Sequence, residues 1–511
     1  MPVYERLALR VAVFAAGGLL MALEVAAFRI IGKTFGSALR ETTTVIAVFL
    51  AAMAIGYWGG GRTADRRPRS STLVATLFAA AGTVLLVPWA DAVLSPLVAA
   101  SGLAMSTHAF VATTVLFAIP TVLLAATSPI AIRLFATTTG ESGATAGGIS
   151  ALSTSGSIAG SLLTAFFLID WLESISRTVI FVALGTGATA LLVVLCSPAA
   201  KKRRRVAVAA AVVVVILSAA FVRSTMVEHR LTAPLKGVKT LYVADSAYHQ
   251  ITVRDRGPFR ELFFNLGVQS RMLRSDPDGP ALEYADSVHI TPLMRPEVRR
   301  VLIIGLGGGS LVKQFARFYP GVEVDAVEVD PVVAQVAERF FGVRTSRNVR
   351  IHVADGRTFL RRSSEKWDLI VVDVYTTNAY GDTIPPHMVT REFFTEIASH
   401  LTERGNFHFH CAFHSSPLLP AIHETARSVF PSVARTEGEV LASRFPLVLD
   451  RELLAGRAKT QPAAVFPYLP RYIADLTPER MPGQAPILTD DYAPVDTLIY
   501  RGTAGRAAVR R

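Results

Sequence analysis

The first half of the chain consists of long hydrophobic segments separated by short polar or basic stretches. Most of these segments reach the roughly 20 residues that a helix needs to cross about 30 Å of hydrocarbon. Glycines four positions apart, such as Gly56 with Gly60 and Gly156 with Gly160, would let helix backbones pack closely. Residues 1–225 are therefore predicted to form an all-α helical membrane bundle. The seven segments lie near residues 7–31, 42–60, 72–90, 108–131, 145–169, 176–196 and 206–222.

The pattern changes after Val222, where hydropathy falls sharply and residues 234–237 resemble a linker. Short alternating runs up to residue 273 indicate a small antiparallel sheet, and a helical stretch completes a predicted domain at residues 239–295. Over residues 296–500, hydrophobic strands alternate with helical segments. That alternation is typical of an α/β doubly wound, Rossmann-like sheet.

A glycine-rich turn follows the first strand of the predicted sheet. The hydrophobic run 301–304 leads into it, a helical segment comes next, and a second strand ends at Glu328. Glycines let the backbone approach a ligand closely, and an acidic residue about 20 positions later can bind ribose hydroxyls. This order of features predicts a nucleotide or nucleoside site. The glycines of the turn are Gly305, Gly307, Gly308 and Gly309.

Two more acidic residues follow predicted strands. Asp355, with Gly356 after it, ends the strand near residues 349–353, and Asp373 ends the strand at residues 367–372. Ligands bind at the carboxyl ends of strands in open α/β sheets. We therefore expect Glu328, Asp355 and Asp373 to lie around one site.

The composition narrows the class of protein. The chain is 51% hydrophobic and only 18% charged, which is too apolar for an ordinary soluble protein. Its net charge of +12 does not indicate nucleic-acid binding, because the basic clusters at residues 62–69 and 201–205 flank hydrophobic segments, as positive-inside loops do. The distant cysteines Cys196 and Cys411 indicate neither a disulfide framework nor a cysteine-based zinc site.

The basic loops also bear on orientation. If they are cytoplasmic, the N-terminus is too, and seven crossings would leave the nucleoside-dependent half outside the cell. We therefore expect an even number of crossings, because either one segment does not cross or residues 91–105 hide an additional one. This predicts a multi-pass protein of the cell membrane, in contact with the lipid bilayer, whose catalytic domain is cytoplasmic. Glu24 and Arg29, in the first segment, either neutralise each other or mark a cation or polyamine site.

The C-terminal half resembles the S-adenosylmethionine-dependent methyltransferase fold. More closely, residues 239–430 resemble the spermidine synthases, which are polyamine aminopropyltransferases. The motifs that carry this resemblance are GVQS, Tyr284 with Asp286, VLIIGLGGGSL, AVEVDP, ADG and WDLIVVD. The whole chain resembles bacterial members with a multi-span membrane domain ahead of the synthase domain, through LEVAAFRIIGKTFGS, FLAAMAIGYWGGGRTADR, IPPHMVTREFF and LTDDYAPVD.

The resemblance implies aminopropyl transfer from decarboxylated S-adenosylmethionine to a polyamine such as putrescine, giving spermidine and methylthioadenosine. Glu328 would bind the ribose hydroxyls of the donor and Asp355 its adenine amino group, beside the glycine loop. Gln269 and Tyr284 would line the donor pocket, and Asp373 would face the reacting centre. No metal is implied. Soluble relatives commonly form dimers or tetramers, so a homo-oligomer is one expected state.

Two positions depart from the soluble enzymes. Their fourth strand carries two aspartates three residues apart, whereas here Thr376 stands three residues after Asp373, and threonine cannot act as the base. Their glycine loop carries an aspartate that binds the donor's amino group, whereas here the position is Gly308. Two alternatives therefore stay open: a methyltransferase that uses S-adenosylmethionine on a membrane-proximal substrate, and a non-catalytic polyamine transporter or sensor.

Other residues could complete the site. Asp491, in LTDDYAPVD, is the first candidate for the missing carboxylate, with a helix-capping or turn role as the alternative, and Asp382 is the second candidate. Tyr375 and Tyr380 could stack on adenine or on an alkyl amine. The histidines near Cys411 favour satisfied sheet positions, with His410 near the pocket, over a metal site. They are His408, His410 and His414.

Overall fold

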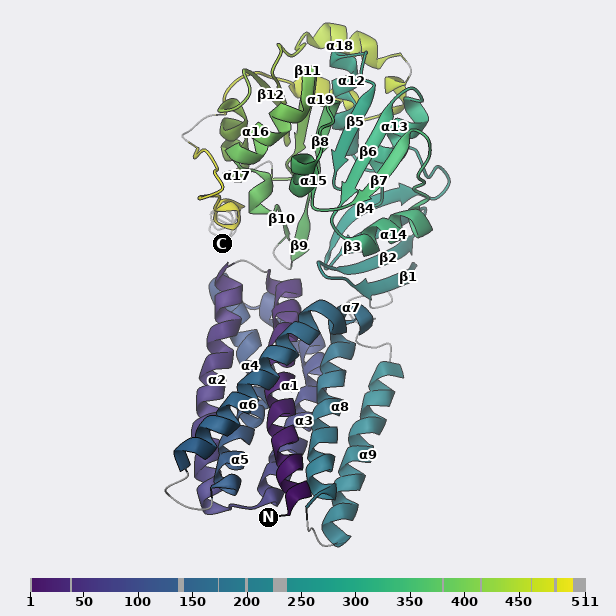
Figure 1. Cartoon of the computed structure of the whole chain (residues 1–511). Coiled ribbons are helices and arrows are strands. Elements are labelled where there is room, and N and C mark those ends of the chain that lie inside the picture. The colour runs from purple at the N-terminus through teal and green to yellow at the C-terminus, as the bar shows by residue number, and fades with distance from the viewer. Residues whose placement is uncertain are drawn as a thin grey trace. The chain divides into compact units, whose positions relative to one another are not determined.

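The structure is a computed structural model in which the chain divides into two compact units (Figure 1). One unit comprises Met1–Leu235 with Ala244–Ala247, and the other comprises Lys236–Val243 with Tyr248–Arg511. The residues that the structure describes are 2–36, 39–136, 142–172, 174–197, 201–223, 237–378, 381–413, 416–460, 462–481 and 485–499.

The first unit is a bundle of helices. Within its described residues, six helices are long and apolar enough to cross a membrane, and the last hydrophobic segment contributes a shorter apolar stretch at Arg205–Ile216. The predicted all-α bundle of apolar helices is confirmed. Its elements are α1 (Val3–Phe35), α2 (Leu39–Arg66), α3 (Ser70–Ala99), α4 (Met105–Ala125), α5 (Thr127–Phe135), α6 (Ser142–Leu163), the π-helix η2 (Thr164–Leu168), α7 (Ile169–Leu172), α8 (Ile175–Leu195) and α9 (Lys201–Arg223).

The suggestion of an additional crossing within residues 91–105 is wrong. Helix α3 continues through Asp91 as far as Ala99, and α4 begins at Met105. Only residues 100–104 therefore join the two helices, which is far too few for a further span.

Small residues bring the helices of the bundle into backbone contact. A Cβ atom added to Gly156 of α6 would lie 1.9 Å from the carbonyl oxygen of Phe14 on α1, and Gly160 is equally crowded by α1. On α2, a Cβ atom added to Gly56 would lie 2.5 Å from the carbonyl oxygen of Val122 on α4. The close packing predicted from the spacing of these glycines is confirmed.

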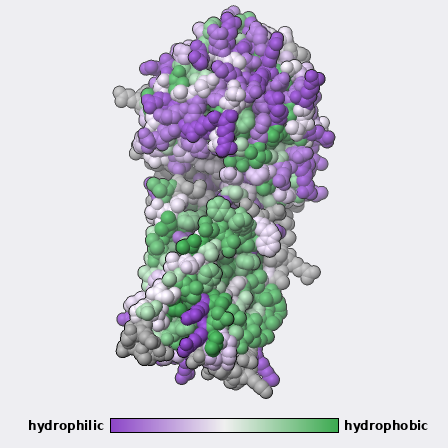
Figure 2. Space-filling model, viewed as in Figure 1, coloured by the Kyte–Doolittle hydropathy of each residue, from purple (hydrophilic) through white to green (hydrophobic). Residues whose placement is uncertain are grey.

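The bundle exposes large apolar side chains. On the face drawn in Figure 2, hydrophobic residues cover much of the bundle. Phe166 of η2 and Trp171 of α7 are 67% and 74% exposed. Contiguous apolar surface of this kind marks contact with a membrane or a partner. Inside the bundle, in contrast, the side chain of Glu24 is buried.

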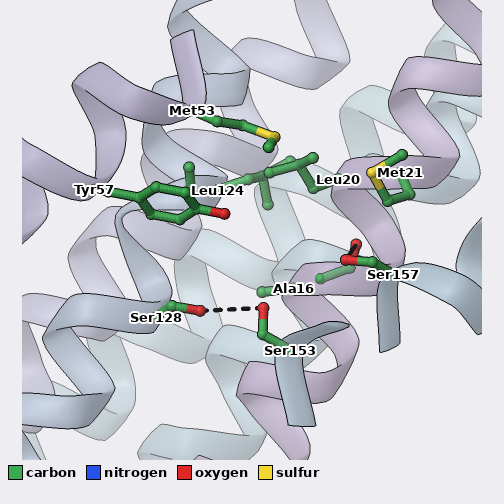
Figure 3. A pocket seen from close by; sticks show the side chains of 11 residues that line it. Ala16, Leu20, Met21, Met53, Tyr57, Leu124, Ser128, Ser153 and Ser157 are labelled. Carbon is green, nitrogen blue, oxygen red and sulfur yellow. Dashed lines mark hydrogen bonds between the residues drawn. The ribbon is translucent and has the colours of Figure 1, made fainter. Parts of the chain in front are cut away.

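A small cavity lies among α1, α2, α4, α5 and α6 (Figure 3). Its volume of 40 Å³ is enough for a few water molecules, and its polar groups could hold them. The hydroxyl of Ser128 donates to that of Ser153 at 3.1 Å, and Ser157 donates to the carbonyl of Gly17 at 3.2 Å. The other lining side chains are mainly apolar and include Leu20, Met21, Met53, Tyr57 and Leu124.

The second unit begins with a four-stranded antiparallel sheet in the order β1-β2-β3-β4. One face of this sheet packs on α14 (Pro331–Phe341), where Ile251 and Leu262 share a hydrophobic cluster with Val333 and Val336. The predicted small antiparallel sheet is confirmed. Its strands are β1 (Val238–Asp245), β2 (Gln250–Arg256), β3 (Phe259–Phe264) and β4 (Gly267–Leu273).

The larger sheet has seven strands in the order β12-β13-β11-β8-β5-β6-β7. The pairs joining β11, β8, β5, β6 and β7 are parallel, whereas β13 pairs antiparallel with both β11 and β12. Successive residues of β5 alternate between two hydrophobic cores, because Leu302 and Ile304 belong to one and Val301 and Ile303 to the other. Both faces of the sheet are therefore buried, and the predicted doubly wound, Rossmann-like architecture is confirmed.

The elements of this sheet follow one another in largely alternating order. The strands are β5 (Arg300–Ile304), β6 (Glu323–Glu328), β7 (Val349–Val353), β8 (Trp367–Val372), β11 (Leu401–His410), β12 (Ser432–Thr436) and β13 (Glu439–Ser443). The helices that accompany them are α11 (Ala285–Val288), α12 (Ile290–Met294), α13 (Ser310–Phe318), α15 (Gly356–Arg362), α16 (Arg391–His400), α17 (Leu418–Arg427), α18 (Arg451–Ala458) and α19 (Leu469–Asp475), together with the short 3-10 helices η3 (Pro386–Met388) and η4 (Ala463–Val465).

Candidate active site

The strand order brings the predicted acidic residues to one edge of the larger sheet. The chain runs outward from β5 through β6 to β7 and then returns to β8, on the other side of β5. A crevice for a ligand is expected outside the carboxyl ends of the strands at such a reversal. Glu328 ends β6 at this edge, and Asp355 and Asp373 lie just after β7 and β8, together with the glycine loop that follows β5.

The glycine loop adopts conformations that side chains disfavour. Gly305 and Gly307 have φ angles of 101° and 51°. A Cβ atom on Gly305 would lie 2.0 Å from the carbonyl oxygen of Asp373, so the loop can run beside β8 only because this residue is glycine.

The backbone of the loop binds Glu328. The N–H groups of Leu306 and Gly307 donate to one carboxylate oxygen at 3.1 and 3.4 Å, and the N–H of Asp330 donates to the other at 3.0 Å. Burial raises the pKa of Glu328, and the three N–H donors oppose that rise by favouring the charged form. The carboxylate is thus fixed where it can still accept further hydrogen bonds.

The small sheet supports the loop from outside. The N–H of Gly308 donates to the hydroxyl of Ser270, on β4, at 2.8 Å. A Cβ atom on Gly308 would lie 2.8 Å from the Cβ atom of Ser270, so an aspartate at this position requires β4 to shift. Ser270 lies in the GVQS motif, but its contact with the loop could not be inferred from the sequence.

Asp355 caps the helix that follows it. Its side chain accepts from the N–H of Thr358 at 2.8 Å, and its other oxygen lies 3.6 Å from Nε2 of His387. Burial raises the pKa of Asp355, but the hydrogen bonds from Thr358 and the neighbouring His387 outweigh that effect and hold the pKa below its usual value. The carboxylate is 41% exposed and is charged at neutral pH.

Asp373 is half-buried beside a tyrosine. The hydroxyl of Tyr284 donates to its carboxylate at 2.9 Å. Burial raises the pKa of Asp373, whereas nearby His410 and the hydrogen bond from Tyr284 oppose the rise. Burial and the charge of Asp373 hold the pKa of Tyr284 well above its usual value, so the phenol stays protonated and keeps its role as donor.

Glu439 joins two histidines of β11 in a buried network. Its carboxylate oxygens lie 2.8 Å from Nδ1 of His410 and 3.0 Å from Nε2 of His408. Burial would raise the pKa of Glu439, but the two histidines hold it well below its usual value. The ring of His410 also stacks on that of Tyr284, with centroids 4.1 Å apart and planes 15° apart. This carboxylate partner could not be found from the sequence, because it is the antiparallel pairing of β13 with β11 that brings it close.

A short hairpin, β9 (Thr376–Asn378) with β10 (Gly381–Thr383), follows Asp373. Gln269 donates to the hydroxyl of Thr377 at 2.5 Å, and that hydroxyl donates to Asp382 at 2.5 Å. The hydroxyl of Thr376 lies 3.4 Å from Nδ1 of His249. Gln269 and Asp382 are thus joined through Thr377, in the hairpin that follows Asp373. Of the other residues considered, Tyr380 and His414 lie outside the described residues.

The three aspartates of the C-terminal motif LTDDYAPVD have different surroundings. Asp490 pairs with Arg357 at 2.7 Å, and Asp496 accepts from the hydroxyl of Thr383, on β10, at 3.0 Å. Asp491 lies exposed in the turn between them. The segment therefore contacts both the helix after Asp355 and the hairpin after Asp373.

Comparison with known proteins matches the second unit to a synthase family and to individual transferases. Residues 284–437 match the family model described as the spermine/spermidine synthase domain. A polyamine aminopropyltransferase of Vibrio vulnificus (strain CMCP6) is 32% identical over 271 residues, which cover 50% of this chain and 89% of that protein. The eEF1A lysine and N-terminal methyltransferase of Bos taurus is 34% identical over 149 residues, covering 27% of this chain and 21% of that protein.

A solved structure is similar as well. The crystal structure of a probable spermidine synthase from Corynebacterium glutamicum ATCC 13032 shares 20% sequence identity, covers 40% of this chain and 80% of that chain, and has a TM-score of 0.36.

The Rossmann-like sheet, with acidic residues at the ends of adjoining strands, places the second unit among the transferases of methyltransferase-type fold. The chain belongs to the spermine/spermidine synthase family, the polyamine aminopropyltransferases. Its first unit adds a bundle of apolar helices to the synthase domain.

Proposed function

We propose that the protein transfers an aminopropyl group from decarboxylated S-adenosylmethionine to a polyamine such as putrescine, releasing spermidine and methylthioadenosine. The observation that carries this proposal is the half-buried carboxylate of Asp373, which accepts a hydrogen bond from Tyr284 beside the glycine loop. Alkyl amines are cations near pH 7, since they titrate like lysine. A half-buried carboxylate next to a nucleoside cradle suits an acceptor of that charge.

The roles of the other residues follow from their places. Glu328, held by the glycine loop, is suited to accept hydrogen bonds from the ribose hydroxyls, and the exposed oxygen of Asp355 is suited to the adenine amino group. Gln269 and Tyr284 are proposed to line the donor pocket. The amine nitrogen would attack the carbon beside the sulfonium, and the carbon–sulfur bond would break to leave neutral methylthioadenosine.

A two-donor assay tests this proposal. The full chain, purified in detergent, would be given putrescine with either decarboxylated S-adenosylmethionine or S-adenosylmethionine. We expect methylthioadenosine to appear only with the decarboxylated donor and only when the amine is present. Release of adenosylhomocysteine would instead identify a methyltransferase. Donor binding without either product would contradict both and favour a transporter or sensor.

Methyl transfer remains the second candidate because two observations favour it. Gly308 leaves no carboxylate at the loop position that would repel the carboxylate of S-adenosylmethionine. The second observation is that part of the chain is similar in sequence to the Bos taurus methyltransferase. Both candidates use the same cradle for the adenosyl group, and they differ in which carbon beside the sulfonium is attacked.

A second carboxylate for the acceptor is proposed to come from Asp382 or Asp491. We expect Asp382→Asn and Asp491→Asn each to lower kcat/KM for the amine by up to about tenfold, or 1.4 kcal/mol, since each removes negative charge from the acceptor side. Steady-state kinetics with putrescine would measure this, with KM for the donor as the internal control. Unchanged kcat/KM in both variants would exclude both residues as the compensating carboxylate.

We also propose that the bundle spans the cell membrane and that the catalytic unit is cytoplasmic. Support comes from the six suitably long apolar helices among the described residues, which is an even number, and from basic clusters that flank them. Association into homo-oligomers stays a prediction.

A further inference from the structure

The cavity of the first unit offers mainly hydrogen-bond acceptors (Figure 3). Of the three serines that line it, Ser128 donates its hydroxyl proton to the hydroxyl oxygen of Ser153, and Ser157 donates to the backbone carbonyl of Gly17. A hydroxyl oxygen that has donated its proton keeps lone pairs that can still accept. A ligand that fits this lining is therefore one that supplies several donors.

The backbone is interrupted beside the cavity. Helix α4 ends at Ala125, which lines the cavity, and α5 begins at Thr127. Pro129 has no N–H group, so the carbonyl of Ala125, four residues earlier, cannot accept the usual helical hydrogen bond from it. Interrupted helices in membrane proteins occur where the backbone lines a cavity, and carbonyl groups at such interruptions bind cations. The interruption therefore favours a cation over a neutral donor.

A buried carboxylate lies one helical turn from the cavity. Leu20 and Met21 of α1 line the cavity, and Glu24 follows on the same face of the helix. The side chain of Glu24 is 9% exposed, and it makes no hydrogen bond or ion pair with another described residue, so it does not neutralise Arg29. A buried carboxylate is costly unless a positive charge compensates it. Glu24 thus adds a second reason for a cation at this place.

We propose that this cavity binds an alkylammonium ion, whose ammonium group donates to the serine hydroxyl oxygens while Glu24 compensates its charge from one turn away. An ammonium group has three N–H donors, which match the three serine oxygens. Divalent metal ions prefer carboxylate ligands and six or more oxygens, and no described residue that lines the cavity is acidic.

The size and the walls of the cavity suit the same class of ligand. Its volume of 40 Å³ holds about three groups of the size of water, such as an ammonium group and the two methylene groups behind it. The chain would lie along Leu20, Met21, Met53 and Leu124, and the ring face of Tyr57 attracts cations. The inference concerns the first unit alone and does not depend on the proposed function. It gives the bundle affinity for the class of molecule that the second unit is proposed to use.

Calorimetric titration of the full chain in detergent with n-butylammonium tests this inference. All variants are made in the Asp373→Asn background, which removes the carboxylate proposed to hold an amine in the second unit. We expect saturable binding in that background. Ser153→Ala should raise Kd about tenfold or more by removing a hydrogen bond to a charged group. Glu24→Gln should also raise Kd about tenfold or more, because it removes a unit charge one turn away.

Two matched controls lie on the same helices. Ser155→Ala removes an exposed hydroxyl of α6 that donates to the carbonyl of Ala151 at 2.9 Å. Glu5→Gln changes a buried glutamate of α1 that accepts from the hydroxyl of Ser70 at 2.8 Å. Both controls should leave Kd unchanged, and equal losses in the controls and in the cavity variants would overturn the inference.

Two further outcomes of the titration would also overturn it. One is the absence of saturable binding in the Asp373→Asn background, which would leave the cavity as a site for water alone. The other is displacement of n-butylammonium by an equal concentration of sodium, which would identify a site for inorganic cations. Failure to form methylthioadenosine in the two-donor assay would count against the proposed function only.

Chemical labelling tests the same site without Glu24→Gln or Ser153→Ala. Aminoethyl methanethiosulfonate carries an ethylammonium group and reacts with thiols. At about ten times its Kd, n-butylammonium should slow the reaction of Ser157→Cys about tenfold, because only the empty fraction reacts. The reaction of Ser155→Cys should not slow. Mass spectrometry separates both sites from Cys196 and Cys411. Equal rates for Ser157→Cys with and without n-butylammonium would overturn the inference.

Discussion

Replacing Asp373 with asparagine is expected to lower kcat for aminopropyl transfer about 100- to 1,000-fold, the effect of removing one preorganised electrostatic group. The amine gains positive charge as it attacks the sulfonium carbon, and the half-buried carboxylate of Asp373 stabilises that charge. Asparagine keeps the shape of the side chain and can still accept from Tyr284, so the loss isolates the charge. Steady-state kinetics with varied putrescine, and donor binding by calorimetry, would measure it.

The stability of this variant separates lost chemistry from lost fold. Because burial raises the folded-state pKa of Asp373, the folded protein binds this proton more tightly than the unfolded chain. The ionised carboxylate therefore destabilises the fold as pH rises above the pKa that Asp373 has in the unfolded chain. Because Asp373→Asn removes this charge, the variant should have a higher Tm at pH 8. The matched control is Glu338→Gln, an exposed carboxylate of α14. A kcat within threefold of the original would contradict the role of Asp373.

Replacing Gly305 with alanine is expected to abolish donor binding and to lower the free energy of unfolding by about 2–6 kcal/mol, combining backbone strain with overpacking. Its φ angle of 101° disfavours any side chain, and the new methyl group would lie 2.0 Å from the backbone oxygen of Asp373. Relief requires the loop to leave β8, which also withdraws the N–H groups from Glu328. Chemical denaturation and calorimetric titration with methylthioadenosine would measure both effects.

Gly321→Ala provides the matched control for this variant. A Cβ atom at Gly321 meets no atom within 4 Å, and its φ lies outside the disfavoured range. This substitution should change neither stability nor donor binding appreciably. If Gly305→Ala behaved like Gly321→Ala, the proposed closeness of the loop and β8 would be wrong.

The sequence was most informative where functional residues could be placed from their position relative to a predicted strand. Glycines after a strand and acids at strand ends predicted where Gly305, Glu328, Asp355 and Asp373 would lie, because parallel strands share one edge. Helical spans were equally visible, since each carries its own hydrophobic pattern. The number of crossings was harder, because hydropathy alone does not show that α3 runs on past Asp91.

Contacts between residues far apart in the sequence, which depend on strand register and on the packing of the sheets, could not be predicted. Glu439 meets His410 only through the antiparallel register of β13, and Ser270 meets Gly308 only because two sheets pack together. The carboxylates of LTDDYAPVD look equivalent in sequence. In the structure Asp490 pairs with Arg357, Asp496 accepts from Thr383, and Asp491 is exposed.

Several hydrogen bonds around the candidate site join residues far apart in the chain. The separation is 89 residues between Tyr284 and Asp373, 108 between Gln269 and Thr377, and 133 between Arg357 and Asp490. Contacts of such span form late in folding, because long loops must close before these contacts can stabilise the fold. Partial opening of the unit would break them while individual helices persist. Activity lost on mild warming would thus report the opening of the candidate site before the loss of secondary structure.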